Sequence, residues 1–189
     1  KLEKLRNLTQ AKKSLLIYCW RGGGRSAFVF EALRKIGIKR ISRLKGGYKA
    51  YRKTVLSGLD SLPSQFRLIV LSGATGTAKT HILRSAASMG AQVLDLEKLA
   101  NHRGSLLGSE PGISQPAQRL FESRLLACFS SFDPTRPVYI EAESNKIGQV
   151  HIPATLWASM RTALRVTVTA PLAARVAFLQ RDYSHIIEN

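Results

Sequence analysis

The stretch YCWRGGGRS, residues 18–26, determines how the first part of the chain is predicted to fold. It follows the apolar run Leu15-Leu16-Ile17, which is typical of a short buried strand. It precedes a helical pattern that Gly37 ends and whose apolar face consists of Ala27, Phe28, Leu33 and Ile36. A single cysteine, Cys19, therefore lies where a strand ends and a glycine-rich loop turns into a helix.

The loop that follows Cys19 is suited to hold an anion. Its residues are Arg21, Gly22, Gly23, Gly24 and Arg25. The glycines let the backbone curl around the sulfur and direct N–H groups at it, and the arginines and the helix dipole add positive potential. We expect the pKa of the thiol to be lowered, so that a thiolate is present at neutral pH. The same loop can carry a persulfide or perselenide, or bind an oxyanion; the alternative is a buried cysteine beside a flexible turn.

The composition is that of a globular protein. The 189 residues are 44% hydrophobic and 22% charged. No apolar run approaches the ~18 residues of a membrane span, so we expect neither a span nor a signal peptide. Two cysteines, Cys19 and Cys128, do not make a disulfide framework and favour a reducing cytoplasmic location.

The positive charge is large and uneven. The net charge is +17, and residues 1–60 hold 16 Lys and Arg against 3 Asp and Glu, whereas the remainder holds 13 against 9. A fold does not need such a field, but a polyanionic partner uses it, and nucleic acid is the leading candidate. A merely soluble basic surface is the alternative. An anionic membrane is less favoured, because the basic residues are spread over all predicted elements.

The order of predicted elements indicates two units. In residues 1–56 a second strand at 40–44 and a helix from Tyr48 follow the cysteine loop and its helix. Residues 57–65, SGLDSLPSQ, are small, polar and turn-forming, and we interpret them as a linker. In residues 66–189 strands at 67–71, 92–94, 138–140 and 165–169 alternate with helices at 80–89, 117–129, 154–160 and 172–183. The segment 97–115 is predicted to be a loop or lid. Such alternation implies a mostly parallel sheet covered by helices.

The second motif is a phosphate-binding loop. GATGTAKT, residues 73–80, lies between a strand and a helix and matches G-x-x-x-x-G-K-[ST] except at Ala78. We expect backbone N–H groups to wrap phosphates, Lys79 to neutralise them and Thr80 to hold Mg²⁺. The methyl group of Ala78 weakens binding if that position needs close approach or unusual φ. The expected phosphate-binding residues are Gly73, Thr75, Gly76, Thr77, Ala78, Lys79 and Thr80. A plain turn with a solvated Lys79 is the alternative.

Acidic residues follow two of the predicted strands. They are Asp95 and Glu97 after one strand, and Glu141 and Glu143 after another. Carboxylates at the carboxyl ends of parallel strands face the ligand crevice, so either pair can orient Mg²⁺ or a water molecule. Capping or solvated carboxylates are equally compatible with the pattern.

Other polar and aromatic residues give weaker predictions. His102 and Arg103 lie in the polar segment and are plausible substrate contacts. The remaining histidines have no metal-ligand spacing, so we predict no zinc site. Cys128 belongs to an amphipathic helix and is interpreted as a core residue. Trp20 either stacks on a nucleic-acid base or packs within the protein.

The chain resembles a known family when the motifs are combined. The cysteine loop followed by LKGGYKAYR, residues 44–52, resembles the second half of a rhodanese domain. Together with the phosphate loop, DLEKLANHRGS at 95–105 and EAES at 141–144, it resembles the tRNA 2-selenouridine synthase family from about Leu15 to Tyr183. The implied fold class is α/β, with a partial rhodanese-like domain followed by a P-loop NTPase-like parallel sheet flanked by helices.

The resemblance implies an enzyme, a selenotransferase. Members replace sulfur by selenium in wobble 2-thiouridine of tRNA, with selenophosphate as donor, and use geranyl diphosphate to make an S-geranyl intermediate. Cys19 matches the essential cysteine of the family, and Gly73, Gly76, Lys79 and Thr80 match its phosphate loop. On this basis the basic unit grips tRNA while Cys19 meets an unstacked wobble base. Arg21 and Arg25 hold selenophosphate, and the phosphate loop holds the geranyl donor.

The chain also departs from the family pattern. The resemblance implies that the first part of a rhodanese domain precedes Lys1 and that the P-loop domain continues beyond Asn189. Ala78 replaces a glycine of the phosphate loop, and Ala142 replaces an acidic residue.

Two other functions fit the residues. One is a rhodanese-type sulfurtransferase that carries a persulfide on Cys19 and has a regulatory P-loop unit that hydrolyses nucleotide. The other is an RNA-binding module in which Cys19 has no chemical role.

Overall fold

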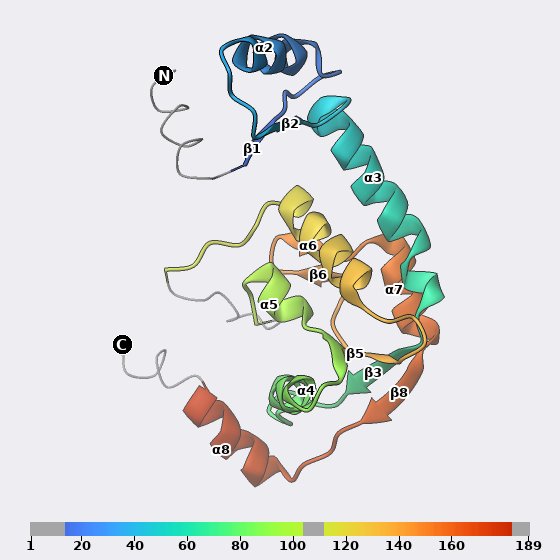
Figure 1. Ribbon diagram of the computed structural model, residues 1–189. Helices are drawn as coiled ribbons and strands as arrows, with labels where there is room; N and C mark the ends of the chain where they lie inside the picture. The colour runs from blue at the N-terminus through green and yellow to red at the C-terminus, as the bar shows by residue number, and fades with distance from the viewer. Residues whose placement is uncertain (1–13, 104–111, 183–189) are drawn as a thin grey trace. The chain divides into compact units, whose positions relative to one another are not determined.

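The computed structural model of the protein describes residues 14–103 and 112–182 (Figure 1). The chain divides into two compact units, residues 1–57 and 58–189. The end of the family motif at Gly104 and Ser105, and the residue Tyr183, lie outside the described residues. The α/β class predicted from the sequence is confirmed in both units.

The first unit is built on a strand–helix–strand motif. Strands β1 (Leu15–Ile17) and β2 (Ile41–Arg43) pair in parallel, with Leu15 opposite Ile41, and helix α2 (Gly24–Lys35) connects them. Helix α3 (Gly47–Ser61) follows β2. The parallel pairing brings the carboxyl ends of both strands to the same edge, so the loop after β1 meets the turn after β2.

Only part of the predicted apolar face of α2 is buried. Leu33 is buried, but Phe28 and Ile36 are 78% and 52% exposed. Ser26, which the pattern did not assign to this face, is buried. The described sheet of this unit has two strands, and a sheet that narrow covers little of a helix.

Residues 57–65, which the composition indicated as turn-forming, are largely helical, and the boundary between the two units falls after Ser57, at the start of this segment. Helix α3 continues to Ser61, and the short 3₁₀ helix η1 (Pro63–Gln65) follows. Gly58 serves close packing rather than a turn, because a Cβ there would lie 2.6 Å from Cδ1 of Leu126. Leu59 is buried, and its carbonyl accepts a hydrogen bond from the Thr155 hydroxyl at 2.8 Å.

The second unit contains a four-stranded parallel sheet in the order β4-β5-β3-β8. The strands are β3 (Leu68–Ser72), β4 (Gln92–Leu94), β5 (Val138–Glu141) and β8 (Leu164–Thr167). The helices are α4 (Lys79–Ser88), α5 (Leu96–Ala100), α6 (Gln118–Ser131), α7 (Ala154–Thr162) and α8 (Leu172–Asp182). The predicted alternation of strands and helices is confirmed.

Two elements of this unit were not predicted. Helix α5 occupies the start of the segment that was expected to be a loop, and Asp95 caps it. A short antiparallel hairpin joins β6 (Lys146–Ile147) to β7 (Val150–His151). Both elements have only two to five residues, too few for a periodic pattern to show.

The core of the second unit lies around β3 and β5. Phe121, Leu125 and Phe129 of α6 are buried, as predicted, whereas Leu120 is half exposed. Val70 and Ile140, which face each other across β3 and β5, are also buried. The buried strands place the loops that follow them at one edge of the sheet, where α/β proteins bind ligands.

None of the helices in the two described ranges is both long and apolar enough to cross a membrane.

Candidate functional sites at the cysteine loop and the phosphate loop

The turn after β2 fixes the backbone of Cys19. The N–H of Tyr48 donates to the carbonyl of Cys19 at 2.8 Å. Gly47 has φ of +64°, and any side chain there would overlap the Cys19 carbonyl. Gly47, the second glycine of LKGGYKAYR, is therefore needed for this close approach.

The glycine loop then turns the chain into α2. Gly22 and Gly23 have φ of +47° and +88°, whereas Gly24 is the first residue of the helix. The carbonyl of Gly23 accepts hydrogen bonds from the Ala27 N–H at 2.8 Å and from Nη1 of Arg43 at 3.3 Å. The loop is thus held in one conformation at the positive end of a twelve-residue helix.

Hydrogen-bond donors lower the pKa of the Cys19 thiol, as the sequence predicted. The largest cause is the backbone N–H of Ser26, followed by its hydroxyl, and the N–H groups of Gly23 and Arg21 contribute less. The Ser26 hydroxyl lies 3.6 Å from Sγ and 2.9 Å from the Gly23 carbonyl, so its single proton serves one of the two. In the neutral form the thiol itself donates to the Arg21 carbonyl at 2.8 Å.

The side chains of the two arginines of this loop are not among the causes of the lowered pKa of Cys19. Both Arg21 and Arg25 are exposed, and the hydrogen bonds rather than these charges account for the lowered pKa of Cys19. Their guanidinium groups remain available to an anion that approaches the sulfur. Cys128, in contrast, is half-buried, and burial raises the pKa of its thiol, which agrees with a packing role.

The phosphate loop connects β3 to α4, as predicted. Gly73 and Gly76 adopt positive φ, and Ala78 lies in the left-handed region with φ of 60° and ψ of 28°. The unusual φ that the sequence raised as one reason for weakened binding is therefore present at Ala78. A residue with a Cβ costs roughly 1–2 kcal/mol in this conformation, so the loop carries strain at that position.

Lys79, the basic residue of the phosphate loop, lines a pocket. Nζ of Lys79 donates to the Gly73 carbonyl at 3.0 Å and lies 3.8 Å from Oε1 of Glu141. Thr75 and Gly76 line the same pocket, whereas Thr77 is buried and donates to the Ala74 carbonyl. The pocket has a volume of about 620 Å³, which is within the usual size of small-molecule sites.

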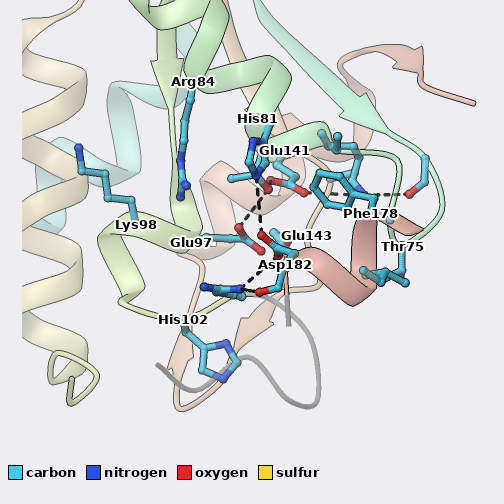
Figure 2. Close-up of a pocket in the computed structure, with 18 of the residues that line it drawn as sticks. Thr75, His81, Arg84, Glu97, Lys98, His102, Glu141, Glu143, Phe178 and Asp182 are labelled. Atoms are coloured by element: carbon cyan, nitrogen blue, oxygen red, sulfur yellow. Dashed lines mark hydrogen bonds and ion pairs between the residues drawn. The ribbon is translucent and has the colours of Figure 1, made fainter. Parts of the chain in front are cut away.

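Three carboxylate side chains gather in this pocket (Figure 2). Oxygen atoms of Glu97, Glu141 and Glu143 lie within 4.8 Å of one another. The Thr80 hydroxyl lies 2.8 Å from Oε2 of Glu141 and 3.1 Å from Oε2 of Glu97. Glu97 lies in the first turn of α5 and Glu141 ends β5, so the sheet order β4-β5-β3 brings them to the start of α4.

Burial of this cluster disfavours its negative charges. Burial raises the pKa of Glu97 to about 8, and the charge of Glu141 adds to the shift. The same two causes raise the pKa of Glu143 to about 7. Burial also raises the pKa of Glu141. At neutral pH the cluster therefore retains protons unless a cation balances its charge.

Asp95 does not join these carboxylates. It accepts the Lys98 N–H at 2.8 Å as the cap of α5 and pairs with Nε of Arg84 at 3.2 Å. The capping role that the sequence left open is the observed one. The predicted pair Asp95 and Glu97 is thus split, because the helix that begins at Leu96 turns the two side chains apart.

His102 and Arg103 both line the pocket, as predicted. His102 is 8% exposed, and its Nδ1 has no hydrogen-bond partner within the described parts of the chain. Nη1 of Arg103 donates to the backbone carbonyl of Asp182 at 2.8 Å and to its carboxylate at 3.1 Å. Arg103 thus holds α8 beside the pocket.

Helix α8 forms a wall of the pocket that the sequence did not reveal. Phe178, Leu179 and Asp182 line the pocket, and Nε of Arg175 donates to the Thr75 carbonyl at 2.8 Å. His81 meets the Phe178 ring edge-on at 5.2 Å between centroids, and its Nε2 lies 3.8 Å from Asp182 (Figure 2). The helix was predicted, but a contact with a loop 100 residues earlier leaves no local pattern.

Comparisons with known proteins find relatives of both units. The model of the tRNA 2-selenouridine synthase AAA domain matches residues 66–189, and that of the rhodanese-like domain matches residues 1–54. The tRNA 2-selenouridine synthases of Nitrosomonas europaea and Chromohalobacter salexigens are 34% and 38% identical, each over 89% of this chain and 44% of their own length. That of Aeromonas salmonicida is 36% identical over 94% of this chain and 47% of its own length.

The chain therefore spans less than half the length of these relatives. The match to the selenouridine synthase AAA domain nevertheless covers more than half of the chain, and the phosphate loop, the carboxylate cluster and α8 all lie within it. The chain belongs to the tRNA 2-selenouridine synthase family.

Proposed function

We propose that the protein is a tRNA-modifying transferase that replaces sulfur by selenium in wobble 2-thiouridine. One observation carries this proposal: a cysteine of lowered pKa in an anion-binding loop and a phosphate loop with a small-molecule pocket occur in the same chain. The relatives named tRNA 2-selenouridine synthase support the choice of reaction.

The cysteine loop is the proposed place of selenium chemistry. Cys19 acts as the nucleophile or selenium carrier, because the N–H groups around it stabilise an anionic sulfur. Gly22, Gly23 and Gly24 shape the loop, and the exposed Arg21 and Arg25 hold the selenophosphate anion. A tRNA carrying 2-thiouridine is the partner, and the basic charge of this unit attracts its phosphates.

The phosphate loop is the proposed place of the geranyl donor. Lys79 and the loop N–H groups bind the diphosphate of geranyl diphosphate, and Phe178 and Leu179 offer apolar surface in the same pocket. Transfer joins the geranyl carbon to the sulfur of thiouridine while diphosphate leaves. The selenium of selenophosphate then attacks C2 of the geranylated base, the C–S bond breaks and geranylthiol leaves with a proton, and water cleaves the remaining P–Se bond to release phosphate.

The carboxylate cluster fits a divalent cation. Glu97, Glu141, Glu143 and Thr80 supply oxygen atoms beside the phosphate loop, and oxygen ligands are those that Mg²⁺ prefers. These four residues would hold Mg²⁺, and the ion would supply positive charge beside the diphosphate site. His102 and Arg103 contact the donor from the facing wall.

A second function is favoured by the cysteine loop taken alone. Donors directed at the sulfur stabilise a persulfide as well as a perselenide. The protein would then be a rhodanese-type sulfurtransferase, and the P-loop unit would bind nucleotide as a regulatory switch.

Mass spectrometry of nucleosides from thiouridine tRNA separates the two functions. Wild-type protein is incubated with geranyl diphosphate alone, selenophosphate alone and both, and Cys19→Ser with both. We expect geranylthiouridine in the first reaction and selenouridine only with both substrates. Unmodified thiouridine throughout, together with thiosulfate turnover that needs no tRNA, would favour the sulfurtransferase instead.

A further inference from the structure

Helix α8 contacts the phosphate loop at two consecutive residues. Nε of Arg175 donates to the carbonyl of Thr75 at 2.8 Å. At the next residue, Gly76, a Cβ would lie 2.8 Å from the carbonyl oxygen of Arg175 and 3.1 Å from Cγ of Leu179. The absence of a side chain at Gly76 therefore lets the helix lie directly on the loop. Thr75, Gly76 and Leu179 also line the pocket, so this contact is part of its wall.

Three successive carbonyl groups of the loop accept hydrogen bonds from side chains. The carbonyls of residues 73 and 74 accept from Lys79 at 3.0 Å and from Thr77 at 2.8 Å, and both donors belong to the loop itself. The third carbonyl, that of Thr75, accepts from Arg175, which lies 100 residues later in the chain. The direction of this third carbonyl thus depends on α8 and not on the loop alone.

The Thr75 carbonyl determines where the N–H of Gly76 points. The peptide bonds of the described chain are trans, and the carbonyl and N–H of one trans peptide point in opposite directions. Arg175 is not among the described residues that line the pocket, whereas Gly76 is. The N–H of Gly76 is therefore directed away from Arg175, and no hydrogen bond within the described chain uses it.

We propose that Arg175 is a positioning residue of the phosphate loop: it holds the Thr75 carbonyl and thereby directs the Gly76 N–H at the diphosphate of the donor. The inference rests on the proposed function in taking this loop as the diphosphate site. A backbone N–H turned to the ligand is the group that such a loop offers to a phosphate oxygen. Arg175 acts through the place of its Nε donor, and its charge is not required.

Two substitutions separate the donor from the charge. Arg175→Gln keeps an N–H donor, because Nε2 of glutamine is as many bonds from Cα as Nε of arginine, but removes the charge. Arg175→Met removes both. Calorimetry with inorganic diphosphate should give nearly wild-type affinity for Arg175→Gln and a roughly tenfold loss for Arg175→Met, since one hydrogen bond to a charged ligand is weakened. An equal loss in both variants would mean that the charge is what matters, and it would overturn the proposal.

Arg181 provides the matched control on the same helix. It is exposed in the last turn of α8, so Arg181→Met removes the same charge from the same helix away from the Thr75 carbonyl. This variant should bind inorganic diphosphate as wild type does. A tenfold loss here as well would assign the effect to the helix as a whole and would contradict a role of the Arg175 contact.

A second readout observes the Gly76 N–H itself in the wild-type chain. Thr75-Gly76 is the single Thr-Gly step of the sequence. Labelling the carbonyl carbon of threonine and the nitrogen of glycine with NMR isotopes therefore gives one peptide signal in a carbonyl-correlated spectrum. We expect inorganic diphosphate to move the amide proton of this signal downfield in wild type and in Arg175→Gln, and to move it less in Arg175→Met. A signal that does not move at saturating diphosphate contradicts the proposal.

The two proposals fail in different ways. If wild type binds inorganic diphosphate and Arg175→Met binds it equally well, only the positioning role of Arg175 is wrong. If wild type does not bind inorganic diphosphate at all, the donor site of the proposed function is wrong together with this inference.

Discussion

Ala78 adds a steric cost to the phosphate loop, although the backbone keeps the left-handed conformation at this position. The loop keeps the left-handed conformation at this position, with φ of 60°, although the residue carries a Cβ. Glycine adopts that conformation without the steric cost, but it also loses more chain entropy on folding. The two effects differ by about 0.5–1 kcal/mol in favour of glycine.

Ala78→Gly should therefore stabilise the protein. We expect the free energy of unfolding to rise by about 0.5–1 kcal/mol, which raises Tm by roughly 2–3 °C in a chain of this size. Thermal unfolding followed by circular dichroism measures the change. Ala74→Gly is the matched control, because Ala74 lies in the same loop without positive φ and should gain nothing. An unchanged or lower Tm for Ala78→Gly would show that the loop is not strained.

Ser26 controls the reactivity of Cys19. Ser26→Ala removes the hydroxyl near Sγ but keeps the backbone N–H, which is the larger cause of the lowered pKa. The pKa of the thiol should therefore rise while remaining below its ordinary value. The rate of alkylation by iodoacetamide as a function of pH, measured in a Cys128→Ser background, gives this pKa. Identical profiles with and without the hydroxyl would assign the effect to the backbone alone.

The carboxylate cluster makes stability depend on pH. The pKa values of Glu97 and Glu143 rise from an ordinary 4.5 to about 8 and about 7, so the folded protein holds protons that the unfolded chain releases. In the presence of a chelator, stability should thus fall as pH rises from about 4.5 to about 8. Glu97→Gln should remove part of this fall and raise Tm by a few degrees at the upper end.

Two observations would decide whether the cluster is responsible. Glu31→Gln changes an acidic residue of the other unit and should leave the pH dependence as it is. Mg²⁺ should restore Tm at the upper end of the range in wild type, because a cation that binds the folded state stabilises it. A Tm that is constant across the range in the chelated protein contradicts the prediction.

At the residue scale, the sequence predicted the chemical properties of single residues better than it predicted which side chains contact one another. The lowered pKa of Cys19 follows from its local motif and is confirmed, and the positive φ at Ala78, which the sequence raised only as a condition, is present. The sequence did not predict which carboxylates form the cluster: Glu97 and Glu143 lie together, whereas Asp95 caps α5. Which carboxylate turns inward depends on where α5 begins, and a five-residue helix gives no periodic signal.

Helix α8 is the element on which the shape of the pocket depends, although none of its residues is buried. Within the described residues it is held by polar contacts of Arg175 with Thr75, and of Asp182 with Arg103 and His81. An element held in this way should open more readily than the buried strands.

Asp182→Ala should release this helix. The substitution removes the ion pair with Arg103 at 3.1 Å and the contact with His81 at 3.8 Å. We expect faster hydrogen exchange of the α8 amides, while exchange in β3 and β5 stays slow. Gln180→Ala is the control, because Gln180 is exposed on the same helix. Equal exchange rates in the two variants would mean that other contacts hold α8.

At the element scale, hydrophobic periodicity predicted which helices and strands form but not which elements they pack against. The long helices and the four strands of the sheet were predicted, whereas the order β4-β5-β3-β8 was not, because strand order is set by long-range packing. Residues 57–61 continue helix α3 and residues 63–65 form η1, although their composition indicated turns. Gly58 and Ser57 suggest a turn in isolation, yet the glycine lets α3 pack closely against Leu126.

At the scale of the whole molecule, charge and phosphate chemistry are assigned to different units. The positive charge was visible in the sequence because composition does not depend on folding. The separation predicts that RNA binding and donor binding respond to different substitutions. Lys45 and Lys49 are exposed on either side of Tyr48 in the first unit, and Lys79 belongs to the phosphate loop of the second.

Neutralising Lys45 and Lys49 to glutamine should weaken tRNA binding and flatten its dependence on salt. Each lost phosphate contact lowers the slope of log affinity against log salt by about 0.7–0.9, so two contacts account for a change of roughly 1.5. Lys79→Gln should leave that slope unchanged but abolish diphosphate binding, measured by calorimetry with inorganic diphosphate. If Lys79→Gln flattened the salt dependence as much as the double variant, tRNA would be bound through the phosphate loop, and the two activities would not be separable by unit.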